Sequence, residues 1–187
     1  MTHSVCPWWI GYLLASPLRR LAYNPARILG PYVQEGMTVL EPGPGMGFFT
    51  LELARLAGAT GRVVATDIQP IMLAGLKRRA AKSGLLPRVE VRLARPESMG
   101  LAGLEGAVDF VLAFAMVHEM PSAAAFFEQA AEAMKPGAGL LLAEPAGHVK
   151  PPEFADELAA AAHAGLRVVD RPEIPHSLTA LLRKGAL

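Results

Sequence analysis

Three glycines at every second position, Gly43, Gly45 and Gly47, follow a short apolar run and the carboxylate of Glu41. Glycine is favoured where φ must be positive or where another group approaches the backbone closely. In an open parallel sheet, the first turn from strand to helix is a common cofactor site. The motif therefore predicts two close approaches to this turn, one by a helix that follows it and one by a ligand.

The spacing of these glycines differs from that of two common nucleotide-binding loops. A dinucleotide fingerprint has glycines at i, i+2 and i+5, and the third of these positions is Phe48 here. The loop also lacks the Gly-Lys-Ser/Thr ending of a phosphate-binding P-loop. The spacing therefore favours neither NAD nor ATP.

Asp67 ends the next apolar run, RVVATD. An acidic residue at the end of the second strand can accept hydrogen bonds from ribose hydroxyls, and a carboxylate facing the diol makes two charge-assisted bonds. Glu41, beside the glycine turn, can meet a positively charged or amino-bearing group. Singly, these residues fit ordinary turn glycines and solvated carboxylates, but the ordered set favours a ligand site.

His118, in the segment AFAMVHEMP after a further apolar run, is the candidate catalytic base. Histidine titrates near neutral pH, so it can take a proton from a bound molecule. Its alternative role is to fix the loop by hydrogen bonds. Glu144 and His148 follow the next run and are predicted to contact a substrate on the same rim. A metal held by these residues and Glu119 is a further alternative, but polar residues are common at strand ends and no metal is predicted.

Alternating apolar runs and helical patterns from Met37 onward predict βα units and a parallel sheet. The last two strands lie too close in sequence for a parallel crossover, so this pair is predicted to be antiparallel. The predicted fold class is α/β: an open, mostly parallel seven-stranded sheet with helices on both faces and an antiparallel last strand. Expected strands span 37–41, 62–67, 88–93, 108–114, 139–144, 166–171 and 178–183, and expected helices span 47–57, 70–83 and 121–134, with one more before Gly165.

Residues 1–35 are predicted to form a short N-terminal helical segment ahead of a ligand-binding domain at 36–187. The aromatic residues Trp8, Trp9 and Tyr12 in this segment would cover an apolar substrate and exclude water, or alternatively pack the segment on the domain. An exposed Trp-Trp helix would favour a homodimer, whereas burial on the same chain would explain it equally well.

The composition limits the classes of partner and location. The 187 residues carry a net charge of +1, which gives no clear signal for nucleic-acid binding. The single cysteine, Cys6, excludes an internal disulfide and fits a reducing, cytoplasmic location. The apolar stretch from Val5 to Ala15 is shorter than the ~20 residues of a membrane-spanning helix, so no transmembrane segment is predicted.

The glycine motif with Glu41, then Asp67, then DFVLAFAMVHEM and MKPGAGLLLAEP, resembles a class I S-adenosylmethionine-dependent methyltransferase. The resemblance extends from about Pro31 to the C-terminus and rests on a fairly specific order of motifs. It implies S-adenosylmethionine as the cofactor and S-adenosylhomocysteine as the product.

The resemblance also implies roles for individual residues. The three glycines and Glu41 would line the methionine portion of the cofactor, Asp67 would hold the ribose, and Ile68 would lie against the adenine, with Phe114 also in the cofactor site. Many relatives place Gly-Asp after the third strand to bind the adenine amino group, and this chain has Ala94-Arg95 there. Glu97, two positions later, is the candidate replacement, although a solvated loop carboxylate is an equal alternative.

We therefore expect an enzyme that transfers a methyl group from S-adenosylmethionine to a small-molecule acceptor. Alignment and exclusion of water can supply much of the rate, and a base is needed only if the acceptor must lose a proton. The alternatives are an RNA or protein methyltransferase and a catalytically silent regulatory protein that binds the cofactor. The segment FAMVHEM lacks the Asn/Asp-Pro-Pro-Tyr type of motif, which argues against methylation of a flipped base.

Overall fold

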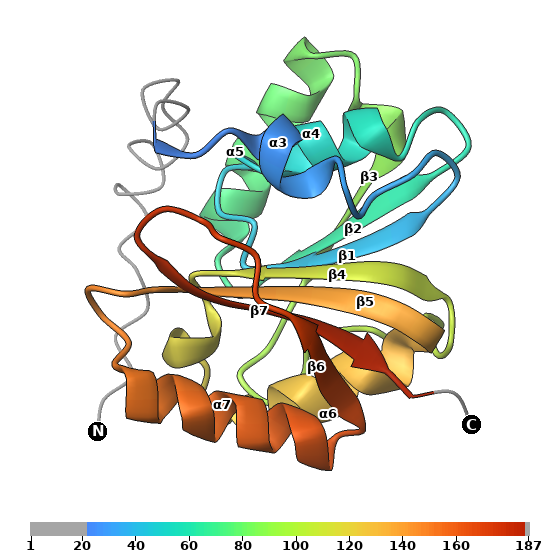
Figure 1. Ribbon diagram of the computed structural model, residues 1–187. Helices are drawn as coiled ribbons and strands as arrows, with labels where there is room; N and C mark the ends of the chain where they lie inside the picture. Colours follow the sequence, from blue (N-terminus) through green and yellow to red (C-terminus); the bar gives the residue numbers. More distant parts are fainter. Residues whose placement is uncertain (1–21, 186–187) are drawn as a thin grey trace.

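The computed structural model describes residues 22–185, in which one mixed sheet has helices on both faces (Figure 1). The strand order across the sheet is β3-β2-β1-β4-β5-β7-β6. β7 runs antiparallel to both neighbours, β5 and β6, and the other pairings are parallel. The predicted seven-stranded sheet with an antiparallel last strand is therefore confirmed. The strands are β1 (Thr38–Pro42), β2 (Arg62–Asp67), β3 (Val89–Leu93), β4 (Val108–Phe114), β5 (Met134–Pro145), β6 (Leu166–Asp170) and β7 (Ser177–Lys184).

The central strands are buried on both faces, which explains their continuous apolar runs. Successive side chains of a strand point to opposite faces, so Val39 joins one hydrophobic cluster and Leu40 the other. α3, α4 and α5 cover the face of Val39, while α6, α7 and the short 3-10 helix η2 cover the face of Leu40 (Figure 1). The helices are α3 (Pro25–Leu29), α4 (Thr50–Leu56), α5 (Pro70–Lys82), α6 (Ala123–Ala133) and α7 (Pro151–His163), with 3-10 helices η1 (Leu86–Arg88) and η2 (Val117–Glu119).

Two predicted helix boundaries differ from the structure for local reasons. α4 begins at Thr50 rather than Gly47, because Gly47 has a φ of +83° and cannot take helical geometry. α6 begins at Ala123, where the hydroxyl of Ser122 accepts a hydrogen bond from the Ala125 N–H at 3.1 Å and caps the helix. At its other end α6 stops at Ala133, and β5 begins directly at Met134, the last residue predicted for the helix.

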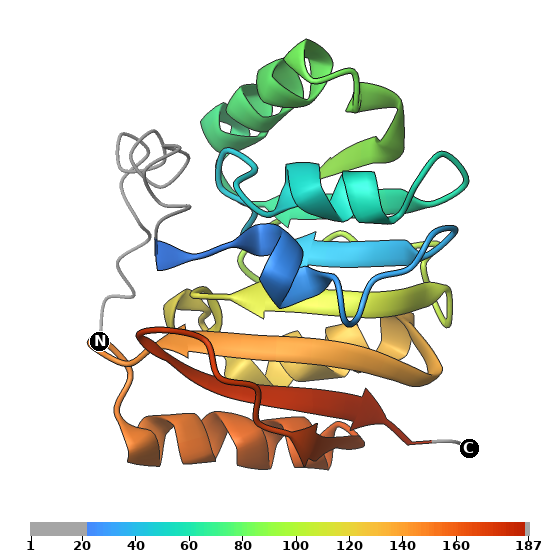
Figure 2. The same cartoon turned by 45° about the horizontal axis from the view of Figure 1, so that its top comes forward.

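The described part of the predicted N-terminal segment packs on the sheet. α3 starts after Asn24, whose side chain accepts a hydrogen bond from the Arg27 N–H at 3.2 Å. Leu29 and Val33 are buried in the hydrophobic cluster that also contains residues of α4. Figure 2 shows α3 beside α4 on the same face of the sheet. Within residues 22–185, no helix combines the length and the apolar character needed to cross a membrane.

The register of the parallel strands brings several predicted site residues to one edge of the sheet. Pro42 of β1 lies opposite Thr66 of β2, and Phe114 of β4 lies opposite Ala143 of β5. The carboxyl ends of these four strands therefore meet at the edge where open α/β sheets bind ligands.

Candidate active site

The turn after β1 has the backbone that its glycines predict. Gly43, Gly45 and Gly47 have φ values of +64°, +53° and +83°, which other residues rarely adopt. A side chain at Gly47 would collide with Cδ1 of Leu76. The predicted close approach of a helix is therefore confirmed, and the helix is α5.

Gly45 faces open space, in contrast to Gly47. A Cβ atom built at Gly45 would have no heavy atom of residues 22–185 within 4 Å, apart from its chain neighbours. The positive φ is therefore not explained by packing against another part of the described chain. The positive φ itself accounts for glycine here, as it does at Gly84, and the open space leaves room for a molecule bound against the backbone. A cofactor in this space stays a prediction.

Gly43 connects this turn to the loop that follows β4. Its N–H donates to the carbonyl of Thr66 at 2.8 Å, which anchors the turn to β2. On its other side, a Cβ at Gly43 would lie 3.0 Å from Cβ of Met116. The close approach of Met116 places the loop of His118 against the glycine turn.

Asp67 is half-buried at the end of β2, where its Oδ1 accepts the N–H of Gln69 at 2.8 Å. Burial raises the pKa of its carboxyl to about 6, although the N–H groups of Gln69, Gly45 and Ile68 oppose this, and the charge of Glu119 adds to it. Asp67 thus lies close both to the glycine turn and to the loop after β4. Its neighbour Ile68 is 41% exposed, an apolar surface beside the predicted ribose site.

Two further predicted cofactor residues lie in the same region. Glu41 is buried at the end of β1, with 4% of its surface exposed. The ring of Phe114, at the end of β4, packs 4.4 Å from the ring of Phe49 and 5.3 Å from that of Tyr23, measured between centroids. Phe114 therefore packs against Phe49, which follows the glycine turn in sequence.

Glu144 forms the centre of the site's polar network. Its Oε1 accepts the N–H of Met116 at 3.2 Å and of Val117 at 2.8 Å, and its Oε2 is bound to Nδ1 of His118. The residue is completely buried. The carboxylate thus faces the loop after β4, not the open rim on which a substrate contact was predicted.

His118 lies in η2 with its side chain 22% exposed. The hydrogen bond that His118 donates to the Glu144 carboxylate raises the pKa of His118, and burial of the ring partly opposes this. The exposed His148 ring lies nearby, with a centroid distance of 6.1 Å. The structure therefore brings together His118, Glu144 and His148, as predicted from their positions at strand ends.

Glu157 of α7 is a member of this cluster that the sequence analysis missed. It is buried, and within residues 22–185 its Oε2 accepts no hydrogen bond. Burial and the charge of Glu144 raise the pKa of Glu157 to about 8, against the opposing effect of His118. A signal was present, because Glu157 stands three residues after Phe154 and four before Ala161, on the buried helical stripe.

The buried Glu157 predicts a pH-dependent stability. Because the folded state holds its proton up to about pH 8 while the unfolded chain releases it near pH 4.5, the parent should lose stability as pH rises between these values. Glu157→Gln should have no such loss, and should exceed the parent by roughly 2–4 kcal/mol at pH 9, with little difference at pH 4.5. Thermal unfolding across this range measures it, with the exposed Glu128→Gln as the control. Parallel pH profiles of parent and Glu157→Gln would contradict the assignment.

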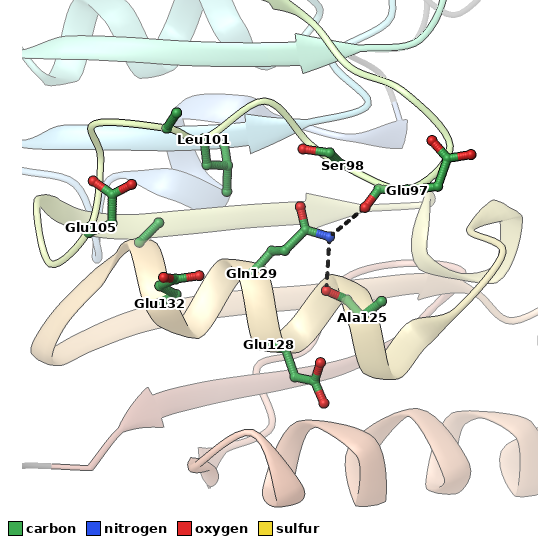
Figure 3. Close-up of a pocket in the computed structure, with 10 residues that line it drawn as sticks. Glu97, Ser98, Leu101, Glu105, Ala125, Glu128, Gln129 and Glu132 are labelled. Carbon is green, nitrogen blue, oxygen red and sulfur yellow. Dashed lines mark hydrogen bonds between the residues drawn. The ribbon is translucent and has the colours of Figure 1, made fainter.

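Glu97 follows β3 and lies at the edge of a cavity. It lines a cavity of about 470 Å³ between the segment after β3 and α6, together with Glu105, Glu128 and Glu132. Gln129 bridges the cavity by donating to the carbonyls of Glu97 and Ala125, at 3.4 and 3.2 Å, and the Glu97 carboxylate points away from it (Figure 3). A contact of Glu97 with the adenine stays a prediction.

The remaining predicted substrate residues are not part of the described chain. Trp8, Trp9 and Tyr12 lie outside residues 22–185. Within those residues, no three His, Cys, Asp or Glu side chains are grouped so that they could hold a metal ion.

Comparison with known proteins supports the fold and the class. Residues 33–179 match the methyltransferase domain family. The chain is 35% identical over 152 residues to a ribosomal protein L11 methyltransferase from Pelotomaculum thermopropionicum. This alignment covers 79% of this chain and 44% of that protein. It is 36% identical over 70 residues to a ubiquinone/menaquinone biosynthesis C-methyltransferase from Klebsiella pneumoniae, covering 37% of this chain and 28% of that protein. The crystal structure of a SAM-dependent methyltransferase from Aquifex aeolicus superposes with a TM-score of 0.85 at 25% identity, over 96% of this chain and 99% of that one.

The fold and the site thus define a class I methyltransferase with S-adenosylmethionine as its cofactor, as the family resemblance of the sequence implies. The chain belongs to the methyltransferase domain family. It spans less than half the length of either of the two curated relatives.

Proposed function

We propose that this protein transfers the methyl group of S-adenosylmethionine to a small-molecule acceptor. The observation that carries the cofactor part of the proposal is the Asp67 carboxylate beside the glycine turn, where the N–H of Gly45 bonds to it and residues 22–185 leave open space. The small-molecule acceptor is carried forward from the sequence analysis. When bound, the cofactor supplies an activated methyl group on a sulfonium ion. Gly43, Gly45, Gly47 and Glu41 would hold its methionine portion.

The ribose and adenine would lie beyond the glycine turn. Asp67 would accept hydrogen bonds from the ribose hydroxyls, with Ile68 against the adenine. The loop after β4 would carry the acceptor site, because Met116 brings it against Gly43. His118 and His148 would face this acceptor, and Trp8, Trp9 and Tyr12 would cover it.

Binding of S-adenosylhomocysteine to the parent and to Asp67→Asn tests this assignment. Ribose hydroxyls bind the ionised carboxylate best, and Asp67 is ionised only above its raised pKa of about 6. The affinity of the parent should therefore fall below pH 6, by up to about tenfold per pH unit. Asp67→Asn should bind more weakly at pH 7.5 and should lack this dependence.

Calorimetric titration between pH 5 and 7.5 measures both effects. An Asp67→Asn protein that binds as tightly as the parent at pH 7.5 would show that the ribose is held elsewhere. Tighter binding of NAD than of S-adenosylhomocysteine by the parent would overturn the cofactor assignment itself.

A protein acceptor is the second candidate, and it is favoured by the 35% identity with the ribosomal protein L11 methyltransferase. Release of S-adenosylhomocysteine separates the two candidates when small phenols, thiols and amines are compared with ribosomal protein L11. Release with none of the acceptors would favour the catalytically silent regulatory protein. A cytoplasmic location and a homodimer stay predictions from the sequence.

A further inference from the structure

We propose that Glu144 is a positioning residue that holds His118 as the neutral base for an acceptor carrying an O–H or N–H proton. This inference rests on the proposed function, because it names the class of acceptor that the methyl group reaches. It assigns to Glu144 a role different from the substrate contact that its place at a strand end predicts.

The two oxygens of the Glu144 carboxylate bind different groups. Oε1 accepts the N–H groups of Met116 and Val117, and so fixes the backbone of the loop after β4. Oε2 is bound to Nδ1 of His118. Because the backbone is held by Oε1, the loop does not need the imidazole as its fixing group.

Glu144 is itself held by the sheet. It lies in β5, where its neighbour Ala143 is opposite Phe114 of β4 and Glu144 is opposite Leu178 of β7. The loop also contains Ala115, a residue other than glycine with a φ of +54°. Such a backbone conformation persists only where the surroundings impose it. Here the next two residues, Met116 and Val117, are held by their hydrogen bonds to Glu144.

The carboxylate determines which nitrogen of His118 is free. An ionised carboxylate only accepts hydrogen bonds, so Nδ1 carries the proton and Nε2 keeps its lone pair. Among residues 22–185, the carboxylate oxygen that lies near Nε2 is Oε1 of Glu119. The two atoms are 4.0 Å apart, which is too far for a hydrogen bond. Nε2 is therefore available to a bound acceptor on a ring that is 22% exposed.

Within residues 22–185, the titratable groups around His118 come from four segments. Glu144 belongs to β5, Glu157 to α7, Glu119 to η2 itself, and His148 to the turn between β5 and α7. The hydrogen bond to Glu144 is the largest cause that raises the pKa of His118, and the charges of Glu144 and Glu119 act in the same direction. Burial raises the pKa of Glu157 to about 8, so it keeps its proton at neutral pH. Because the pKa of His118 is raised, the neutral base is available only above that raised pKa.

The reaction balances with these groups alone and the bound cofactor. With the cofactor bound, a lone pair on the acceptor oxygen or nitrogen would form the new bond to the methyl carbon, and the carbon–sulfur bond would break and leave its electrons on sulfur. The acceptor proton moves to Nε2 of His118, and Glu144 stabilises the imidazolium that results. The proton then passes to water, which restores the neutral ring.

Imidazole nitrogen NMR tests the inference without cofactor or acceptor. In the parent, the neutral His118 ring should be protonated at Nδ1, with a pKa above the ordinary value of about 6.5. In Glu144→Gln, the amide oxygen can still accept the N–H groups of Met116 and Val117, while the NH2 group faces Nδ1. The ring should then switch to the form protonated at Nε2, and its pKa should fall by at least about one unit.

Controls separate this role from a purely structural one. His118→Asn identifies the signals of His118 among the five histidines. Glu119→Gln changes a nearby carboxylate that is not bonded to the ring, so Nδ1 should stay protonated. Glu144→Gln should bind S-adenosylhomocysteine within about threefold of the parent, since the cradle is built from other loops.

Several results would overturn the inference. One is a neutral His118 ring that is protonated at Nε2 in the parent protein. This result would overturn the inference even if Glu144→Gln does not fold. Another is an unchanged tautomer and pKa in a folded Glu144→Gln protein. Turnover confined to tertiary amines or thioethers, which have no proton to lose, would contradict the acceptor class. A parent protein that does not bind S-adenosylhomocysteine would instead contradict the proposed function.

Discussion

Gly45→Val is expected to reduce the affinity for S-adenosylhomocysteine by at least about 100-fold, or roughly 2.7 kcal/mol, while the protein stays folded. The added side chain would project into the open space beside the turn, where a Cβ has no heavy atom within 4 Å. In the proposed complex this space is filled by the methionine portion of the cofactor. The loss should therefore arise from a direct clash with the ligand.

The strain of the substitution needs a matched control, because Gly45 has a φ of +53° and valine is unfavourable there. Gly84→Val supplies it, since Gly84 has a φ of +68° and equally open surroundings. It follows the 13-residue α5, about 20 Å along the helix from the site edge. Both variants should lose about 1–3 kcal/mol of stability.

Calorimetric titration and thermal unfolding of both variants distinguish the two effects. Affinity should be lost in Gly45→Val and kept in Gly84→Val. Near-normal affinity in a folded Gly45→Val protein would mean that the cofactor does not lie against this turn.

The sheet could be predicted closely because its strands are buried on both faces. Residues 62–67 and 108–114 form strands with the predicted bounds, because each contains a run of four apolar or small residues that is buried in the sheet. The antiparallel last pair followed from the short connection between 171 and 178. The start of the helix predicted at 47–57 was less accurate, because Gly47 ends the preceding turn with a positive φ that apolar periodicity does not report. The hydroxyl of Ser122, by contrast, is a capping group that its residue type indicates.

The roles of the two buried glutamates could not be predicted in the same way. Glu144 stands at a strand end, where side chains are often exposed, and its burial depends on the backbone of a loop 27 and 28 positions earlier. Glu157 lies on a stripe whose apolar members were recognised, but its interaction with Glu144 and His118 depends on how α7 packs. Sequence spacing locates such residues on a strand or helix, and only tertiary contacts show what their carboxylates face.

The position of Glu97 illustrates a further limit. The segment after β3 makes a tight turn in which Arg95 pairs with Ser98, and this turn places Glu97 at a cavity against α6. The local sequence RPES predicts a turn but not its direction. The predicted adenine contact therefore depended on a loop conformation that residue types alone do not define.

His118→Asn is expected to lower the turnover number by about 10²–10⁴-fold when the acceptor must lose a proton. Asparagine cannot take up a proton, whereas the affinity for S-adenosylhomocysteine should be unchanged, because Gly45 and Asp67 belong to other loops. Turnover of the parent should fall as pH drops through the raised pKa of His118, since the protonated ring is no base. This acidic limb should be absent from the residual activity of the variant.

The measurement uses the first phenol or amine found to release S-adenosylhomocysteine, with rates taken from pH 5.5 to 9. His163→Asn is the control, because His163 is an exposed histidine at the end of α7 that bonds only its own helix, at the carbonyl of Ala159. If His118 only fixed its loop, the variant would instead lose thermal stability and cofactor affinity together and keep the acidic limb. The hydrogen bonds from Met116 and Val117 to Glu144 argue for the first outcome, because they hold the loop whether or not residue 118 is a histidine.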